Sequence, residues 1–388
     1  MKQIVDTINS KGDRYWMKMK PIKLGMIGSG HVSSRYFEQV AKLENVEFVA
    51  TCARHLEHAE QKAAAYGVPR WYDDYHVMLE KEELDAVVVT TPHSAHAEPV
   101  MAALEHGLHV MNEKPMATSF DDCKRMVTLA EQKGAIFMSL PFDLHPILLA
   151  AAEYVNEQYI GKITGAEAQL SLPGPWRDNW YYNKTVAHGG AVLDCLVYPV
   201  SRLVALLGPA VSVMAEVGTL IPKRIVGDGK KVNSDVDDNV TVIVRFAGGQ
   251  HAVIRTLWGM SFKQNHTLIY GRSGTIALND SGYPLVIHSP KQALPDAEPV
   301  SWRGLPDCYV PRQAIASFQA KDAMTYFTDC IRSGKQPVQS GRQQLHVHEI
   351  MFGAYRSAES GRRYDLSTTF TPWDKLDAAI FDTRSDYI

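Results

Sequence analysis

The feature that most constrains the fold is an alternation of short apolar runs with amphipathic helical stretches over the first 145 residues. The runs at Ile22–Ile27, Val46–Ala53 and Asp85–Pro92 are apolar almost throughout, without the in–out alternation of a strand that has one wet face. Strands of this kind are buried on both faces, as in a parallel sheet covered by helices. Right-handed crossovers then make this part of the chain a doubly wound α/β domain of the Rossmann type.

After about residue 160 the pattern changes to longer strands with few helices between them. The segments NVTVIVRF and QHAVIRTLW are separated by Ala247-Gly248-Gly249, which is a hairpin signal. The pattern predicts an open, mainly antiparallel sheet in an α+β domain. The segments are KITGAEAQLSL, AVSVMAEV, NVTVIVRF and QHAVIRTLW.

The chain therefore divides into three parts. We expect residues 1–21 to be an extension, residues 22–145 a Rossmann domain, and residues 146–388 a second, α+β domain. Helices of this last part are expected near 146–158, 190–207 and 321–360, and the last group is expected to pack back on the Rossmann domain.

Composition narrows the class of protein. The 40 basic and 43 acidic residues give a net charge of −3, which provides no field for nucleic acid or an anionic membrane. We expect no membrane span, because no 18 consecutive residues are apolar, and no signal peptide. The five cysteines are widely spaced and form no C-x-x-C pair, so a reducing compartment, the cytoplasm, is expected.

The sequence GSGHVS, directly after the first apolar run, has the form of a dinucleotide-binding turn between a strand and a helix. Gly28 permits the tight turn, Gly30 lets the backbone approach a pyrophosphate, and Ser33 is small enough for the helix to pack on the strand. The amides around His31 and Val32 would face the phosphates. A tight turn without a ligand is the alternative.

The end of the second strand bears on the choice of cofactor. An acid about 20 residues after the turn would bind the ribose 2′-hydroxyl of NAD, but the chain has Ala53 there, followed by Arg54. The missing acid removes repulsion against a 2′-phosphate, and Arg54 could neutralise one. The pattern favours NADP, with NAD as the alternative if Arg54 is only a solvated surface residue.

Two polar clusters lack the spacing of a metal site. LHVHEI, at 345–350, is not H-E-x-x-H, and its histidines at i and i+2 point to different sides of a helix. DVDDN, at 235–239, lacks the EF-hand pattern and is expected to be a turn before a strand. We expect no bound metal.

Two short motifs lie downstream of the glycine turn: a T-P-x-x-x-H motif at 91–96 and E-K-P at 113–115. Together they closely resemble the signature of the glucose–fructose oxidoreductase, inositol dehydrogenase and rhizopine-catabolism (Gfo/Idh/MocA) family. The resemblance spans about residues 22–366, through IGKITGAEA, GGAVLDCLVYPVSRLVALLG and AMTYFTDCIRSGKQPVQSG.

The resemblance implies hydride transfer between a nicotinamide and a carbinol carbon of a sugar, polyol or sugar derivative. It implies that Lys114 is catalytic and lies beside the nicotinamide. The family's D-x-G-x-H motif aligns with residues 194–198, where Asp194 keeps the acid, Leu196 replaces the glycine and Tyr198 replaces the histidine. A tyrosine here is similar to a branch of the family that often uses NADP.

The residues expected to bind the cofactor come from the turns after successive strands. His96 has an alternative role as a structural histidine, and Pro92 as the end of its strand. Glu113 is expected to pair with Lys114 or to help fix its position. The full set is Gly28, Gly30, His31, Val32, Ala53, Arg54, Thr91, Pro92, His96, Glu113 and Lys114.

Alcohol oxidation needs a base, because the hydroxyl proton must leave as hydride leaves carbon. A tyrosine has a pKa near 10, which an adjacent ammonium would lower. We expect Lys114 and Tyr198 to be the proton-transfer pair, in an order that the sequence leaves open. Asp194 lies four residues before Tyr198, on the same helical face, and is expected to assist. A helix-surface acid and a core tyrosine are the alternatives.

The stretch LPGPWRDNWYYN gathers aromatic and polar side chains after a strand, a combination that suits the faces and edges of a carbohydrate. A rim loop or an oligomer contact is the alternative. The candidate substrate residues are Trp176, Arg177, Trp180 and His188.

Two other functions fit the same motifs. Some relatives use tightly held NAD in a cycle of oxidation, elimination and reduction, as a glycosidase or lyase without net redox change. The family also includes a dinucleotide-binding regulator, which would not need Lys114, Asp194 and Tyr198. Small-molecule binding and a homodimer or homotetramer are expected in each case.

Overall fold

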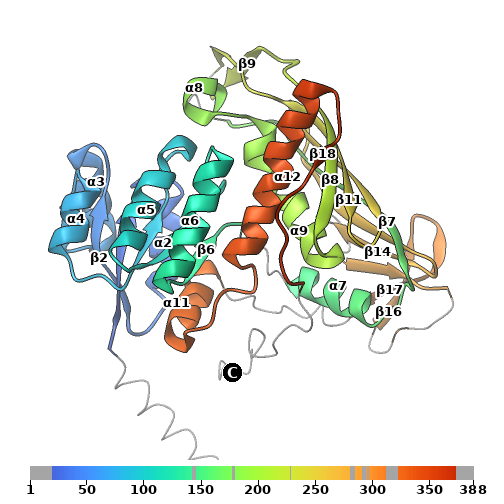
Figure 1. The fold of residues 1–388 in the computed structure, drawn as a ribbon, viewed down its shortest axis with the longest axis horizontal. Coiled ribbons are helices and arrows are strands. Elements are labelled where there is room, and N and C mark those ends of the chain that lie inside the picture. Colours follow the sequence, from blue (N-terminus) through green and yellow to red (C-terminus); the bar gives the residue numbers. More distant parts are fainter. Residues whose placement is uncertain are drawn as a thin grey trace, which may run out of the picture.

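The structure, a computed structural model, describes residues 20–141, 146–176, 180–227, 229–279, 285–290, 294, 297–311 and 322–372. Two large sheets lie side by side, with helix α12 (Gly341–Ser360) running between them (Figure 1). The first 19 residues of the expected N-terminal extension lie outside the described residues.

The N-terminal sheet has six parallel strands in the order β3-β2-β1-β4-β5-β6, which confirms the predicted doubly wound architecture. The order reverses between β1 and β4, so the carboxyl ends of these strands form the edge at which such folds bind ligands. The short, polar β3 was not predicted. The strands are β1 Ile22–Ile27, β2 Val46–Cys52, β3 Arg70–Tyr72, β4 Ala86–Val89, β5 His109–Asn112 and β6 Phe137–Ser139.

Helices cover both faces of this sheet. One core contains Leu24, Met26 and Val88, and the other contains Ile27 and Val87 from the alternate positions of the same strands. This two-sided burial explains why the strands are apolar throughout. The helices are α2 Ser33–Val40, α3 Leu56–Tyr66, α4 Tyr75–Lys81, η1 His93–Ala95, α5 Ala97–Glu105 and α6 Phe120–Lys133.

The C-terminal sheet has ten strands in the order β16-β17-β15-β14-β13-β7-β12-β11-β8-β18. Its pairs are antiparallel except β7–β12, and Ala247–Gln250 joins β11 to β12 as the hairpin signal predicted. The strands, with a separate two-stranded arm of β9 and β10, are β7 Ile163–Leu172, β8 Ala210–Gly218, β9 Lys223–Val226, β10 Lys230–Asn233, β11 Asn239–Phe246, β12 His251–Trp258, β13 Gln264–Gly271, β14 Thr275–Asn279, β15 Leu285–His288, β16 Ala297–Trp302, β17 Leu305–Pro311 and β18 Tyr364–Asp365.

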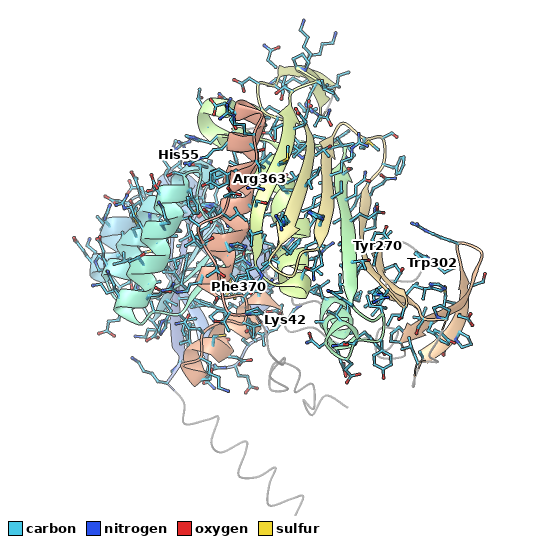
Figure 2. All side chains as sticks on the ribbon, turned by 45° about the vertical axis from the view of Figure 1, so that its right-hand side comes forward. Lys42, His55, Tyr270, Trp302, Arg363 and Phe370 are labelled. Atoms are coloured by element: carbon cyan, nitrogen blue, oxygen red, sulfur yellow. The ribbon has the colours of Figure 1, made fainter. Side chains whose placement is uncertain are left out.

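Helices cover one face of this sheet and form the largest core. A smaller core gathers Leu268, Val286 and Val310 with Tyr270 and Trp302, which lie at the far end of the sheet in Figure 2. The helices are α7 Pro146–Asn156, η2 Trp180–Tyr182, α8 Lys184–Ala187, the π-helical segment η3 Val192–Leu196, α9 Val197–Leu207, α11 Ala323–Ser333 and α12.

One helical stretch of the described residues, Lys184–Leu207, is long and apolar enough to cross a membrane by length and composition alone. Of its apolar window, 72% is buried inside the structure, as in a core helix. All five cysteines are buried.

The C-terminal helices pack on the Rossmann domain. The backbone N–H of Met324, in α11, donates to the Gln39 side chain of α2 at 3.4 Å. Arg342, in α12, makes a bidentate ion pair with Glu131 of α6, at 2.6 and 2.8 Å.

The LHVHEI cluster is structural. His348, fully buried in α12, accepts the Met116 N–H at Nε2 (2.7 Å), while its Nδ1 faces the Gln344 carbonyl (2.7 Å). Glu349 accepts hydrogen bonds from the amides of Ser367 and Thr368. Within the part of the chain that is described, no three His, Cys, Asp or Glu side chains are grouped to hold a metal.

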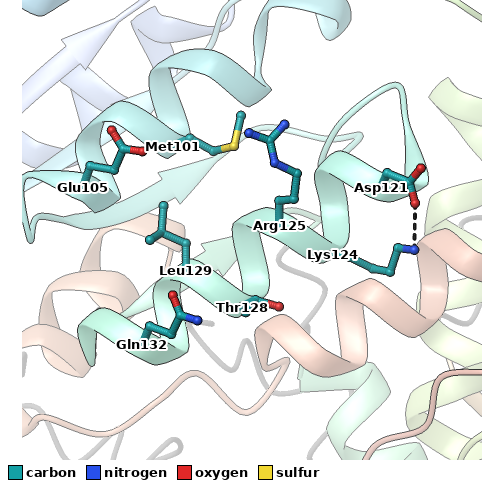
Figure 3. A pocket seen from close by; sticks show the side chains of 8 residues that line it. All are labelled: Met101, Glu105, Asp121, Lys124, Arg125, Thr128, Leu129 and Gln132. Carbon is teal, nitrogen blue, oxygen red and sulfur yellow. Dashed lines mark ion pairs between the residues drawn. The ribbon is translucent and has the colours of Figure 1, made fainter.

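A shallow groove of about 620 Å³ lies between α5 and α6 (Figure 3). Lys124 and Asp121 at its edge form an ion pair at 2.7 Å, so these two charges compensate each other. None of its lining residues belongs to the site described below. They are Met101, Glu105, Asp121, Lys124, Arg125, Thr128, Leu129 and Gln132.

The anchoring of α12 by a neutral histidine should make stability depend on pH. Burial lowers the pKa of His348 from its ordinary value of 6.5 to about 4. Between these values the unfolded chain binds more protons, so the free energy of unfolding should fall as pH drops, by on the order of 3 kcal/mol for this group. His348→Gln should reduce the slope of the melting temperature against pH between 6.5 and 4. The exposed His55, in contrast, should be replaceable without effect, and an unchanged slope in His348→Gln would refute the assignment.

Candidate active site

The candidate site lies where the carboxyl edge of the Rossmann sheet meets the η3–α9 helix of the second domain. Lys114, directly after β5, forms an ion pair from Nζ to Oδ1 of Asp194, and its Nζ is 3.4 Å from the Asp194 carbonyl oxygen. The same Nζ lies 5.6 Å from the ring centroid of Tyr198. Only 14% of the Lys114 side chain and 15% of the Asp194 side chain are exposed. The structure thus brings together the three residues predicted to be catalytic.

Glu113 fixes the turn and does not pair with the Lys114 ammonium. Its Oε1 accepts a short hydrogen bond from the Tyr36 hydroxyl, and its Oε2 accepts the Lys114 backbone N–H at 3.0 Å. Of the two roles expected for Glu113, the structure shows the second. The Lys114 ammonium pairs with Asp194 instead.

Buried polar groups hold the rest of the E-K-P turn. The ring nitrogens of His96 lie 2.7 Å from the Pro115 carbonyl and 2.8 Å from the Thr91 carbonyl, so the histidine ties the turn after β5 to the turn after β4. Asn112 donates to the Met116 carbonyl at 2.8 Å. Since His96 is fully buried, these contacts favour its structural role.

The helix that carries Asp194 is anchored by the acidic run before β11. The Asp237 carboxylate accepts the N–H groups of Gly190 (2.8 Å) and Val192 (2.7 Å) and the Tyr355 hydroxyl (2.6 Å). A Cβ on Gly190 would lie 2.0 Å from the Asp237 carbonyl oxygen, so this close approach requires glycine. The sequence predicted only a turn at Asp237. The backbone groups that its carboxylate binds lie far away in the sequence, so no local pattern indicates them.

The protonation of the pair differs from the expected pattern. Burial alone would lower the pKa of Lys114, but Asp194, Tyr198, Tyr181 and Glu113 together raise it well above its ordinary value. Burial also raises the pKa of Tyr198, and Asp194 adds to this rise, although Lys114 opposes it as expected. Both groups are therefore protonated at neutral pH in the cofactor-free protein.

An aromatic wall borders the pair. Trp180 stacks on Tyr181 at 3.9 Å between centroids, and both rings contact His93, at 4.6 and 5.4 Å. His93 is buried, and burial, assisted by Lys114, lowers its pKa well below the ordinary value. Lys114 and Asp194 both act on the pKa of Tyr181, which burial raises to about 12. Neither His93 nor Tyr181 was among the predicted site residues, although both stand within the quoted motifs.

The other predicted substrate residues are less closely connected to the pair. Trp176 is 71% exposed. His188 is exposed and ends α8 in the left-handed conformation, with φ of 61°. Arg177 lies outside the described residues.

The glycine turn has the geometry of a dinucleotide site. Gly28 has φ of +107°, and a Cβ there would lie 2.7 Å from the Thr90 backbone, so only glycine fits. A Cβ at Gly30, by contrast, would meet no atom of the described structure within 4 Å, which leaves open space before α2. Ser33 is buried and donates to the Gly30 carbonyl at 2.7 Å. These residues fit a pyrophosphate at the start of α2, with His31 and Val32 exposed beside it.

Side chains of both charges lie near the end of β2. Ala53 is half-buried and Arg54 is exposed, as the sequence suggested. Asp73 and Asp74, directly after the neighbouring strand β3, are close enough to contribute to the raised pKa of Cys52, after burial. Asp74 accepts the His76 N–H and caps α4. Asp73, the other acid near this end of β2, has no such capping role.

A Rossmann sheet with a phosphate-sized space at its glycine turn, and a lysine paired with an acid from a second domain, is the architecture of a nicotinamide-dependent oxidoreductase. Residues 22–140 match the family model "Oxidoreductase family, NAD-binding Rossmann fold", and residues 148–277 match "GFO/IDH/MocA C-terminal domain". The chain belongs to the Gfo/Idh/MocA family of oxidoreductases.

Similar proteins agree with this membership. Levoglucosan dehydrogenase of Pseudarthrobacter phenanthrenivorans is 25% identical over 67% of this chain and 74% of its own. The NADP(+) scyllo-inositol 2-dehydrogenase IolU of Bacillus subtilis is 24% identical over 70% of this chain and 78% of its own. A solved structure of levoglucosan dehydrogenase with NADH and L-sorbose has the same fold, with a TM-score of 0.78 and 20% identity over 90% of this chain and 100% of that one.

The two glycines of the turn should separate folding from cofactor binding. Gly30→Ala should leave the melting temperature close to that of the wild type, because its Cβ meets no protein atom. It should weaken NAD(P)H binding by about tenfold or more, because the methyl group enters the phosphate space. Gly28→Ala should instead destabilise the fold by about 2 kcal/mol or more. Thermal unfolding and NAD(P)H fluorescence titration measure both effects, and full affinity in Gly30→Ala would place the phosphates elsewhere.

Proposed function

We propose that this protein transfers hydride between NAD(P) and a carbinol carbon of a sugar, polyol or sugar derivative. The observation that carries the proposal is the Lys114–Asp194 pair, with Tyr198 beside it, at the carboxyl edge of the Rossmann sheet. The names of the relatives, a levoglucosan and a scyllo-inositol dehydrogenase, support a substrate with several hydroxyl groups. Trp180 and Tyr181 offer it an apolar wall.

The bound nicotinamide supplies the hydride acceptor or donor, and the protein's own residues manage the proton. Glycine-turn amides would hold the pyrophosphate. Tyr198 or Lys114, once it has lost its own proton, would receive the hydroxyl proton during oxidation, and its protonated form would donate a proton to a carbonyl during reduction. Asp194 would keep the Lys114 ammonium oriented toward the substrate oxygen through their ion pair.

Replacement of Lys114 tests the proposal directly. Lys114→Met should lower kcat by about 10²–10⁴-fold, because it removes a group that moves or stabilises the proton. Lys124→Ala, on the exposed side of α6, is a matched control that should retain full activity. The assay is absorbance at 340 nm with NAD and NADP against a panel of sugars and polyols.

The pH profile adds a second readout to this assay. The pKa values of Lys114 and Tyr198 are both raised. We therefore expect kcat/KM for oxidation to rise with pH in the alkaline range. Full activity of Lys114→Met would refute the catalytic assignment. Turnover of a glycosidic substrate without any net change at 340 nm would instead indicate the redox-neutral cycle.

We further propose a preference for NADP over NAD. Ala53 brings no acid to the ribose, and the exposed Arg54 can reach a 2′-phosphate. If Asp73 took the place of that acid, NAD would be preferred. Arg54→Ala should lower the ratio of kcat/KM for NADP to that for NAD by about tenfold, whereas Asp73→Ala should leave it unchanged. A large rise of the ratio in Asp73→Ala, with no fall in Arg54→Ala, would contradict the preference.

We also propose that the open face of the C-terminal sheet pairs subunits into a homodimer or homotetramer. Met214, Ile243 and Val253 are direct neighbours across β8, β11 and β12, and they are 47%, 46% and 47% exposed. An apolar row of this kind is typical of an interaction surface. Light scattering should give a multiple of 43.2 kDa, and Ile243→Asp should shift it to the monomer. Leu56→Asp, at an exposed position on α3, should leave it unchanged.

A further inference from the structure

The second carboxylate oxygen of Asp194 does not face Lys114. Its Oδ2 lies 3.6 Å from the sulfur of Cys195, the next residue in the π-helical segment η3. The indole N–H of Trp258 donates to the same sulfur at 3.1 Å. Cys195 and Trp258 are 1% and 2% exposed, so water does not compete for these contacts.

The two hydrogen bonds that link Trp258, Cys195 and Asp194 can run in only one direction. An indole nitrogen only donates, so the sulfur accepts from Trp258, and the thiol hydrogen remains for the Asp194 carboxylate, which only accepts. Burial, with Asp194 as the next cause, raises the pKa of Cys195 well above its ordinary value, so the thiol stays protonated. Cys195 is therefore a hydrogen-bond donor here and not a nucleophile.

The donor at the far end of the chain is itself fixed. Trp258 ends β12, and its backbone N–H donates to the Asp238 carbonyl at 2.8 Å. The Asp238 carboxylate forms a buried ion pair with Arg224 at 2.8 Å. These contacts fix Trp258 against the sheet. Its indole N–H can therefore hold the Cys195 sulfur in a fixed position.

We propose that Cys195 and Trp258 are positioning residues that hold Oδ2 of Asp194, so that Oδ1 stays directed at Lys114. This inference rests on the proposed function for its effect on turnover. A carboxylate can rotate about its Cβ–Cγ bond, and a single ion pair with a flexible lysine does not prevent this. A second contact does, because it comes from a thiol that a side chain of the sheet holds in turn.

The variants separate hydrogen bonding from packing. Cys195→Ala removes the donor, whereas Cys195→Ser keeps a donor of similar size at the same place. Trp258→Phe removes the N–H and leaves most of the ring. Cys123→Ala is the control, because it removes a fully buried thiol from the Rossmann core, away from the pair.

The first readout is the kinetics of sugar oxidation. Cys195→Ala should lower kcat about tenfold with less than about a twofold change in KM. Its apparent pKa on the alkaline side should fall by about half a unit, because Lys114 is less firmly paired. Cys195→Ser should restore both values, and Trp258→Phe should give a smaller loss in the same direction. Equal losses in Cys195→Ala and Cys195→Ser, or an unchanged pH profile in Cys195→Ala, would overturn the proposal.

The second readout needs no turnover. Competitive acetylation of Lys114 by acetic anhydride, quantified by mass spectrometry from about pH 7 to about pH 11, reports the protonation of the lysine, because only the unprotonated amine reacts and its fraction grows about tenfold per pH unit below the pKa. Lys114 should react at lower pH in Cys195→Ala than in the wild type or Cys123→Ala. If no sugar were oxidised but this difference persisted, the proposed function would fail while the positioning role stood. The absence of the difference would refute the positioning role itself.

Discussion

The ion pair between Lys114 and Asp194 is the interaction around which the rest of the structure is arranged. It joins the carboxyl edge of the Rossmann sheet to the η3–α9 helix of the second domain, and both side chains are mostly buried. Burying such a pair contributes little to stability, because the lost hydration of two charges offsets most of their attraction. The presence of this buried pair where the two domains meet is therefore better explained by chemistry than by folding.

Each partner of the pair is held by its own set of buried polar groups. On the lysine side, Glu113 binds Tyr36, and His96 spans the two turns. On the acid side, Asp237 binds the amides that precede the helix. Satisfied networks of this kind rigidify their surroundings, since each unpaired group would cost free energy in the interior. The site thus takes its geometry from residues that would not contact a substrate.

The sequence could predict the local parts of this arrangement and not the long-range ones. Fully apolar strands, a glycine turn and the E-K-P motif are short patterns, and each predicted its local element correctly. The partners of Asp237, His348 and Glu113 lie far away in the chain or on another element, and no local pattern encodes them. The parallel β7–β12 pair escaped prediction for the same reason, because β8 to β11 lie between its two strands in the sequence.

The charges of the site also bear on which residue carries the proton. Lys114 is paired with the Asp194 carboxylate, and Asp194, the tyrosines and the nearby Glu113 outweigh burial and raise its pKa. Burial and the same carboxylates raise the pKa of Tyr198, but the Lys114 ammonium opposes this rise and favours the phenolate. Loss of the phenol proton leaves an anion beside the ammonium, whereas loss of the lysine proton leaves Asp194 and Glu113 without a buried counter-charge. The second arrangement is the costlier one. The electrostatics thus favour Tyr198 as the group that exchanges the proton and Lys114 as the cation that stabilises it.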